Sequence, residues 1–270
     1  MLANWIYSNP TWLWGPVLVA AFVAVSCSGL LVFNRVLHPT HRAASSAEFA
    51  AVFTVIGTVY AVLIAFVAVA AWQAYSDANR VVQEEAEHLT NMYRDVAGLE
   101  PADVERMHKL LYEYTKHVVS VEWAAQTAGK PIDRKPGREI LARLHLETLA
   151  LGHGGKYAVV QAEVFRELNK LYEARRARHL AAGADSGIPA VIWCIILIGT
   201  SLMVFTSYML AVSSVRLHVL LVALASSSIA LVVVLVVDLD QPFRGDLAVS
   251  KEPYTLTMDQ MVPPGERGRK

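Results

Sequence analysis

Two clusters of charged side chains offer the clearest chemistry in this sequence. The densest acidic cluster is Gln83-Glu84-Glu85-Ala86-Glu87, and the densest basic cluster comprises Arg175, Arg176 and Arg178. In an oligomer, a ring of carboxylates could select cations or hold a divalent ion, and a ring of guanidinium groups could attract anions. The sequence favours a plainer interpretation, in which both clusters are solvated helix faces that form interhelical ion pairs.

A second candidate is a row of small residues in an apolar segment. Gly57, Ala61 and Ala65 recur every four residues, and Thr54 and Thr58 lie on or beside the same helical face. Small residues at this spacing let helices approach closely in lipid. The same face could instead line a narrow pore, and the sequence leaves both interpretations open.

Signals for catalysis or metal binding are weak. His38 and His41 flank Pro39 without a nearby thiol or carboxylate pattern, and we expect a solvated loop there rather than a metal site. Ser226, Ser227 and Ser228 have no base in the same segment, so nucleophilic catalysis is not indicated. We therefore predict no enzymatic activity, no cofactor and no metal.

Composition excludes further classes of function. The chain has 270 residues, of which 54% are hydrophobic, and its 24 basic residues balance its 24 acidic ones. This balance argues against a nucleic-acid-binding protein. Cys27 and Cys194 both lie in apolar segments, so a disulfide framework is not expected.

The stretch that must position these candidates runs from Phe49 to about Val96. Residues 49–76 carry no charged side chain and exceed the ~20 apolar residues that span a bilayer. No glycine or proline follows Trp72 until Gly98, and apolar residues continue at helical spacing beyond Asp77. We therefore predict one continuous helix, half in lipid and half in water.

Hydropathy predicts an all-α, polytopic membrane protein with four transmembrane helices and a helical soluble domain between spans two and three. The first segment is kept as a span because it lacks a basic region and is too long for a signal peptide. The expected spans are Trp12–Phe33, Phe49–Ser76, Pro189–Val212 and Leu217–Val237.

The charged middle region predicts four amphipathic helices packed as a bundle. These run from Asp77 to near Gly98, from Pro101 towards Gly129, from Glu139 to Leu151 and from Tyr157 to Leu180. Gly129–Gly137 is predicted to be a loop, and the tail after Glu252 to be extended or disordered. The chain is therefore predicted to divide into the first two spans (1–76), the helical cytoplasmic domain (77–186), the hairpin of the last two spans (187–240) and the C-terminal tail (241–270).

Four spans place both termini and the middle region on one side of the membrane. Arg35, Arg42 and Arg216 lie in the two short loops on the other side. More cations flank the spans on the first side, which favours a cytoplasmic location for it and suggests a bacterial inner membrane. These cations are Arg80, Arg175, Arg176, Arg178, Arg244 and Lys251.

The sequence resembles the bestrophin-like membrane domain family, which has bacterial and plant members. The Glu122-Trp123 pair and the run from Asp240 to Gly245 are its more specific elements. The matching residues are Gly57, Tyr60–Phe66, Glu85-Ala86, Leu89, Tyr93-Arg94, Tyr114, Glu122-Trp123, Arg175, Arg178, Ile188-Pro189, Trp193 and Asp240-Gln241-Pro242-Phe243-Arg244-Gly245. Together they cover nearly the whole chain.

The resemblance implies a four-span subunit with a helical domain between spans two and three. True bestrophins share this layout and assemble as pentameric anion channels around span two. Their phenylalanine-rich neck is not found here, because Phe53 and Phe66 are not spaced as that neck. The resemblance therefore supports architecture better than ion selectivity.

These observations lead to two hypotheses. The first is an oligomeric ion channel, conducting anions, with span two lining the pore through Thr54, Gly57, Thr58, Ala61 and Ala65. Its partners would be the lipid bilayer, further copies of the chain and small inorganic ions, but not nucleic acid. The vestibule or gating candidates are Glu85, Glu122, Arg175, Arg178 and Asp240. The alternative is a membrane-anchored interaction or sensory module without conduction.

Overall fold

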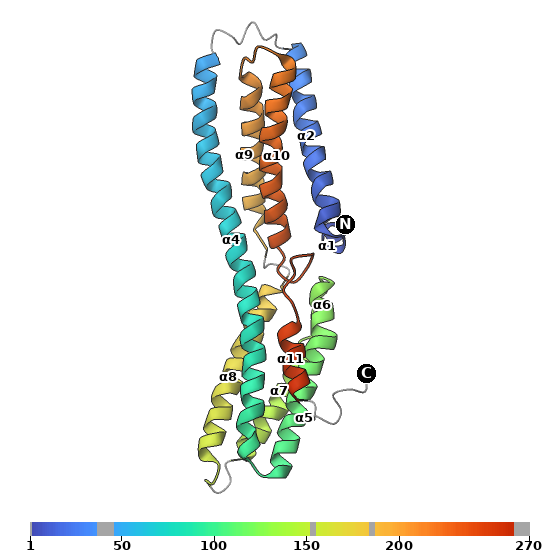
Figure 1. Ribbon diagram of the computed structural model, residues 1–270. Helices are drawn as coiled ribbons and strands as arrows, with labels where there is room; N and C mark the ends of the chain where they lie inside the picture. The colour runs from blue at the N-terminus through green and yellow to red at the C-terminus, as the bar shows by residue number, and fades with distance from the viewer. Residues whose placement is uncertain (1, 37–45, 152–154, 184–186, 262–270) are drawn as a thin grey trace. The chain divides into compact units, whose positions relative to one another are not determined.

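The computed structural model describes residues 2–36, 46–151, 155–183 and 187–261, and these are helical with no strand among them (Figure 1). His38 and His41 lie outside the described residues. The helices are α1 (Leu2–Ser8), α2 (Thr11–Val36), α4 (Ser46–Asp95), η1 (Val96–Gly98), α5 (Pro101–His117), η2 (Val118–Glu122), α6 (Trp123–Thr127), α7 (Lys135–Ala150), α8 (Ala158–Ala181), α9 (Ala190–Met209), α10 (Val215–Leu239) and α11 (Glu252–Met261).

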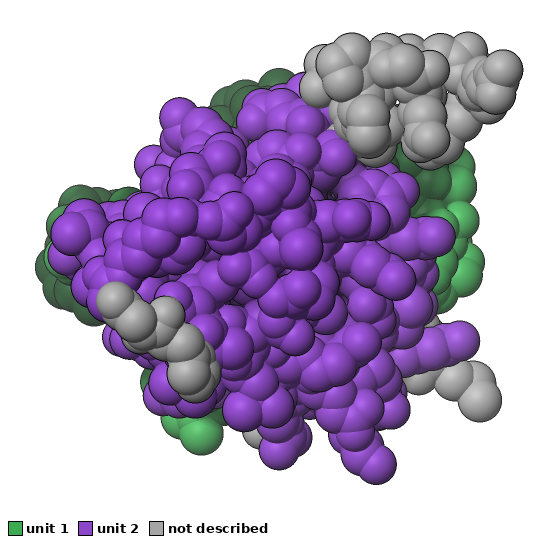
Figure 2. Space-filling view, turned by 90° about the horizontal axis from the view of Figure 1, so that it is seen from below, with its two compact units in different colours: residues 1–74, 187–241, 245–247 green, residues 75–186, 242–244, 248–270 purple. Residues whose placement is uncertain are grey.

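The chain forms two compact units, which Figure 2 colours separately. We call residues 1–74, 187–241 and 245–247 the membrane unit, and residues 75–186, 242–244 and 248–270 the helical unit. The boundary falls inside α4, between Ala74 and Tyr75.

The membrane unit contains the four apolar segments expected from the sequence. In the part of the chain that the structure describes, α2, α4, α9 and α10 are long and apolar enough to cross a membrane. Most of their apolar side chains face outward, as in a protein whose solvent is lipid. The fold is therefore the predicted all-α polytopic membrane protein.

Polar contacts tie these apolar helices together. Tyr208 of α9 donates a hydrogen bond to the Ser26 carbonyl of α2 at 2.6 Å. Tyr60 of α4 lies 2.5 Å from the Thr200 hydroxyl of α9, and its ring passes so close to Gly199 that a Cβ there would lie 2.5 Å from it. Hydrophobic attraction between helices is absent in lipid, so such close approaches and hydrogen bonds fix which faces meet.

The predicted continuous helix is confirmed. Helix α4 extends unbroken for 50 residues from Ser46 to Asp95, and a 3-10 turn then leads to Gly98. Its apolar part belongs to the membrane unit and its amphipathic part to the helical unit. The absence of glycine and proline after Trp72 is the local reason that the helix does not stop.

The helical unit is a bundle of the second part of α4 with α5, α7, α8 and α11 (Figure 1). Its buried core includes a stripe along α4 formed by Ala78, Val82, Ala86, Leu89 and Met92. Spacings of three and four residues place these side chains on one helical face, as the sequence predicted.

The helix predicted from Pro101 towards Gly129 is present as far as Thr127, and it contains a π-helical turn. After α5 ends at His117, residues Val118–Glu122 form a π-helical turn, and α6 comes next. A π turn inserts an extra residue per turn and so rotates the helix beyond it. Glu122 at the end of this turn and Trp123 after it are both buried, and the sequence contained no signal for the π turn.

The prediction for the tail was wrong over residues 252–261, and residues 262–270 lie outside the described residues. Residues 252–261 form helix α11 instead of an extended or disordered segment. Tyr254, Thr257 and Met261 are buried, and their spacing of three and four residues makes one helical face. Thr257 contacts the Thr90 hydroxyl of α4 at 3.0 Å, so the helix is held by tertiary contacts that a charge-rich composition did not reveal.

We predict that Tyr254→Ala destabilises the helical unit. The tyrosine is fully buried, so its removal leaves a cavity, and we expect a loss of about 3 kcal/mol or more. The measurement is chemical unfolding of the detergent-solubilised protein, followed by tryptophan fluorescence. Leu256→Ala is the control because this side chain is 55% exposed on the same helix, and it should change stability by less than about 0.5 kcal/mol. Equal effects of both substitutions would contradict the docking of α11.

Candidate buried ionic cluster

Four charged residues from three parts of the chain meet inside the helical unit. They are Glu85 of α4, Glu122 of η2, and Arg175 and Arg178 of α8. Glu85, Glu122 and Arg178 have no exposed surface, and Arg175 is 7% exposed. Charged groups are almost never buried to this extent unless they are paired, and we call these four residues the ionic cluster.

Arg178 is the centre of the ionic cluster. Its Nε donates to Glu85 Oε2 at 2.7 Å, and its Nη2 donates to Glu85 Oε1 at 3.1 Å. The same Nη2 donates to Glu122 Oε2 at 2.7 Å. The planar guanidinium thus binds one carboxylate through two nitrogens and reaches the second, a geometry that lysine could not reproduce.

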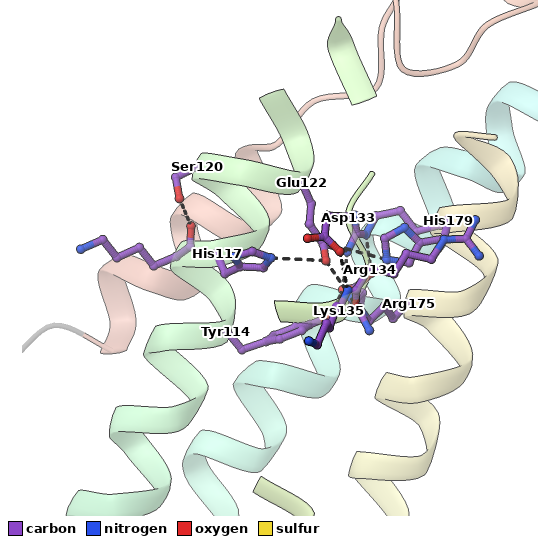
Figure 3. Close-up of polar contacts among 12 residues, drawn as sticks. Tyr114, His117, Ser120, Glu122, Asp133, Arg134, Lys135, Arg175 and His179 are labelled. Carbon is purple, nitrogen blue, oxygen red and sulfur yellow. Dashed lines mark hydrogen bonds and ion pairs between the residues drawn. The ribbon is translucent and has the colours of Figure 1, made fainter. Parts of the chain in front are cut away.

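Arg175 completes the charge balance (Figure 3). Its Nη2 donates to Glu122 Oε1 at 2.8 Å and to the carbonyl oxygen of Arg134 at 3.2 Å. Two carboxylates therefore face two guanidinium groups, and the ionic cluster carries no net charge. Arg175 and Arg178 are three residues apart on α8, which places both on one helical face.

Gly137 near the start of α7 makes room for the Arg175–Glu122 pair. A Cβ at this position would lie 2.5 Å from Arg175 Nη2 and 2.7 Å from Glu122 Oε1. Helix α7 begins at Lys135, four residues earlier than predicted, with Pro136 in its first turn. Because α7 starts earlier, Gly137 belongs to the helix at the point where α7 lies against the Arg175–Glu122 ion pair.

Aromatic side chains enclose the ionic cluster. The Tyr114 hydroxyl donates to Glu85 Oε1 at 2.6 Å. The Arg178 guanidinium lies 5.9 Å from the centroid of the Tyr254 ring, and Arg175 lies at the same distance from the Tyr114 ring. Trp123 packs edge-on against Tyr254 and also against Phe243. The aromatic rings exclude water while their faces stabilise the cations.

Two histidines approach Glu122 from opposite elements. His117 Nε2 at the end of α5 lies 3.7 Å from Glu122 Oε1, and His179 Nε2 on α8 lies 3.5 Å from Glu122 Oε2 (Figure 3). These are ion-pair distances only if the imidazoles carry a proton. Nearby arginines already compensate the carboxylate.

Burial and charge set the protonation states. Burial alone would raise the pKa of Glu122, but Arg178 and Arg175 outweigh it and lower the pKa to about 2. Burial, reinforced by the charge of Arg178, lowers the pKa of His179 to about 4. Burial raises the pKa of Tyr114 and of Tyr254 well above the ordinary range, and the charge of Glu85 adds to this. At neutral pH the Glu122 carboxylate is thus charged, while His179 and both tyrosines are neutral.

The chemistry of the ionic cluster suits the positioning of helices better than catalysis or metal binding. Every charge in the ionic cluster is met by an opposite one. Within the described ranges, no group of three histidine, cysteine, aspartate or glutamate residues is arranged to hold a metal ion. Arg175 Nε and Arg178 Nη1 are buried without a hydrogen-bond partner among the residues that the structure describes, but the ion pairs themselves fix the mutual register of α4, η2 and α8.

The structure separates the two interpretations of the charge clusters residue by residue. The expected interhelical ion pairs are present, but Glu85, Arg175 and Arg178 are buried instead of solvated. Only part of each cluster behaves as a solvated face. Half-buried Glu84 pairs with Arg80 on its own helix, and Arg176 is exposed.

Asp240, the fifth vestibule or gating candidate, belongs to the membrane unit. Its Oδ1 accepts a hydrogen bond from the backbone N–H of Ile188 at 2.6 Å. A Cβ on Gly187 would lie 3.1 Å from the same oxygen. Asp240 therefore links the segment after α10 to the segment that leads into α9.

The candidate pore residues on α4 do not behave alike. Gly57 packs against α9, because a Cβ there would lie 3.3 Å from Met203 Cε. Thr54, Thr58, Ala61 and Ala65 are exposed in the single chain. Both threonine hydroxyls donate to their own helix, to the carbonyls of Ala50 and Thr54.

These four exposed residues form one face, which we call the small-residue face of α4. At about 100° per residue they fall within about 60° of one another. The α9-facing residues Tyr60 and Ile64 are centred about 100° away around the helix. The small-residue face thus points away from the contacts that Tyr60 makes with α9.

Sequence reasoning missed several members of the site. His117, His179 and Tyr254 were not predicted to surround Glu122 and Arg178. His179 comes directly after Arg178, which is a weak signal in hindsight. Tyr254 could not have been placed while its segment was predicted to be a tail, and the π turn that aims Glu122 has no sequence signature.

Comparison with known proteins agrees with this architecture. The family model of the Bestrophin-like domain matches residues 20–254. A bacterial Bestrophin homolog from Klebsiella pneumoniae with a point mutation matches with a TM-score of 0.69 and 12% identity, covering 92% of this chain and 99% of that chain. Another structure of a Klebsiella pneumoniae Bestrophin homolog, solved by Zn-SAD phasing, has a TM-score of 0.66 and 13% identity, with coverages of 90% and 95%. At these identities the likeness concerns the fold, and no curated protein matches the chain.

We predict that breaking the ionic cluster at its centre is costly. Arg178→Met leaves Glu85 without its partner in a buried site, and we expect a loss of about 3–5 kcal/mol of unfolding free energy. The double variant Glu85→Leu/Arg178→Met should lose less than Arg178→Met, because it leaves no unpaired charge at Glu85. Unfolding in detergent measures both, with exposed Arg176→Gln as the control, expected within about 0.5 kcal/mol of the unmodified protein. A double variant no more stable than the single would contradict the pairing.

Stability should also fall in acid. An unfolded histidine takes up a proton below its ordinary pKa of 6.5, whereas folded His179 does so only near 4. The unfolded state therefore gains as the pH falls from 6.5 to 4, by on the order of 2–3 kcal/mol. Glu122, whose pKa is lowered from 4.5 to about 2, adds a second loss below pH 4.5.

The measurement is the unfolding free energy between pH 7.5 and 4 for the unmodified protein and for His179→Gln. The variant has no imidazole at this position, so its stability should fall less between pH 6.5 and 4. Parallel curves for the two proteins would contradict the assignment to His179.

Proposed function

Because the chain belongs to the bestrophin-like family, we propose that it is an oligomeric membrane ion channel that conducts anions, with the apolar part of α4 lining the pore. Bestrophins, which the sequence resembles, are channels of this kind built around span two. The proposal extends that arrangement to this chain.

The observation that carries the proposal is the small-residue face of α4. Thr54, Thr58, Ala61 and Ala65 are exposed in a single chain, lie on one side of a membrane-spanning helix and point away from the contact with α9. A face of small, weakly polar residues suits a narrow passage between copies of the chain. Gly57 lies at the edge of this face, where it lets α4 approach α9.

Anion conduction is compatible with the chemistry of this face. Residues 49–76 contain no carboxylate that would repel an anion. Pore selectivity can arise from apolar constrictions and from the field of backbone dipoles, without a buried cation. The threonine hydroxyls bind their own backbone and so contribute oxygen dipoles, not charge.

In this proposal the vestibule or gating candidates do not contact the conducted ion but hold the helices in place. Arg178 and its partners Glu85, Glu122 and Arg175 hold the amphipathic part of α4 in the helical unit. Asp240 holds the segment that leads into α9. The ionic cluster itself is closed to ions, because its charges are buried and mutually compensated.

The proposed setting is a bacterial inner membrane, with both termini and the helical unit in the cytoplasm. The support is the excess of arginine and lysine near the span ends on that side. The proposed assembly is a ring of identical subunits, since one α4 helix cannot enclose a pore.

We predict that the purified protein conducts anions in liposomes. We also predict that chemical modification of a cysteine on the small-residue face reduces this flux. The background is a variant in which Cys27 and Cys194 are replaced by alanine. Ala61→Cys should then allow a charged methanethiosulfonate reagent to reduce chloride flux by about half or more, because the added group occupies the passage. Val59→Cys is the matched control, since Val59 is also exposed but lies about 130° around the helix from the centre of this face.

Absence of flux above empty vesicles across pH, calcium and voltage would favour the alternative, a membrane-anchored interaction module. Flux that is equally sensitive at Val59→Cys and Ala61→Cys would retain a channel but contradict the assignment of the pore face. Cation flux in place of chloride flux would contradict the selectivity.

A further inference from the structure

The helical unit has an open hollow between α5 and α7 that the ion-conduction proposal does not use. Its volume is about 670 Å³. Pro136, Ile140 and Ala142 supply an apolar wall from α7, while Lys116 and His117 line it from α5. Small-molecule sites are mostly apolar hollows of this size with a few placed polar groups.

Within the described part of the chain, some of the charged side chains around the hollow form ion pairs and one does not. Glu113 accepts a hydrogen bond from Arg143 at 2.6 Å, and Glu139 lies 3.8 Å from Lys135. Both carboxylates are therefore compensated by cations of their own. Lys116 also lines the hollow, and its ammonium makes no ion pair among the described residues. One positive charge remains available to an occupant.

His117 connects the hollow to the ionic cluster. Its side chain is 13% exposed and lines the hollow, while its Nε2 lies 3.7 Å from Glu122 Oε1 (Figure 3). An occupant of the hollow thus touches the residue that faces the buried carboxylate. It also contacts both α5 and α7, the helices on either side of the π turn and its loop.

We propose that this hollow binds a small organic anion, distinct from the ions that the pore conducts. Its acidic group is bound by Lys116, and its apolar body packs on Pro136, Ile140 and Ala142. The apolar wall gives a bare inorganic ion nothing to pack against, whereas an organic body buries apolar surface there. The uncompensated lysine selects an anion over a cation of the same shape.

The test uses the full-length protein in lipid nanodiscs, with benzoate as the probe and saturation-transfer NMR as the readout. Benzoate should bind more tightly than benzamide, a neutral molecule of nearly the same shape. Lys116→Gln should weaken benzoate binding by about threefold to fivefold, which corresponds to one solvent-accessible ion pair. Lys130→Gln removes the same charge from the helical unit outside the hollow and should leave the affinity unchanged.

A second variant tests the hollow without altering its charge. Ala142 is exposed, so Ala142→Phe can fill the hollow without disturbing the core, and it should abolish benzoate binding. The site is overturned if benzoate does not bind, if benzamide binds equally well, or if Lys116→Gln and Ala142→Phe both retain full affinity. Binding is measured without reference to flux, so this test and that of the channel succeed or fail separately.

Discussion

The helical unit depends on the bidentate contact between Arg178 and Glu85. Both side chains are fully buried, so each would carry a large desolvation penalty if the other were absent. The contact is possible only when α4 and α8 are in one register. Glu122 then accepts from Nη2 of the same guanidinium, a nitrogen that also donates to Glu85, and Arg175 pairs with Glu122. Because each of these buried charges needs an oppositely charged partner, the ion pairs restrict the positions of α4, η2 and α8 relative to one another.

The membrane unit is governed by a different constraint. In lipid, burying apolar surface gives no advantage, so close approach and hydrogen bonding decide the packing. Tyr60 meets Thr200 and passes over Gly199, which fixes one face of α4 against α9. Another face, with Thr54, Thr58, Ala61 and Ala65, is left uncovered. The same tyrosine contact that anchors the helix therefore defines which side of α4 stays exposed in the single chain.

These two constraints act on a single helix. Because α4 is unbroken from Ser46 to Asp95, the residues that orient its apolar part and those that orient its amphipathic part share one backbone. Tyr60 orients the apolar part, and Glu85 orients the amphipathic part.

The sequence by itself determined the four apolar spans, the continuity of α4 and the helical character of the middle region, because hydropathy and helical periodicity are local properties of the chain. It also singled out Glu85, Glu122, Arg175 and Arg178. Only the tertiary structure decided that these four are buried together, that a π turn aims Glu122, and that residues 252–261 form a docked helix. These features depend on residues that are distant in the sequence. A charged side chain is buried only where an oppositely charged side chain pairs with it. The short helix α11 is stable only because Tyr254 packs into the core of the helical unit.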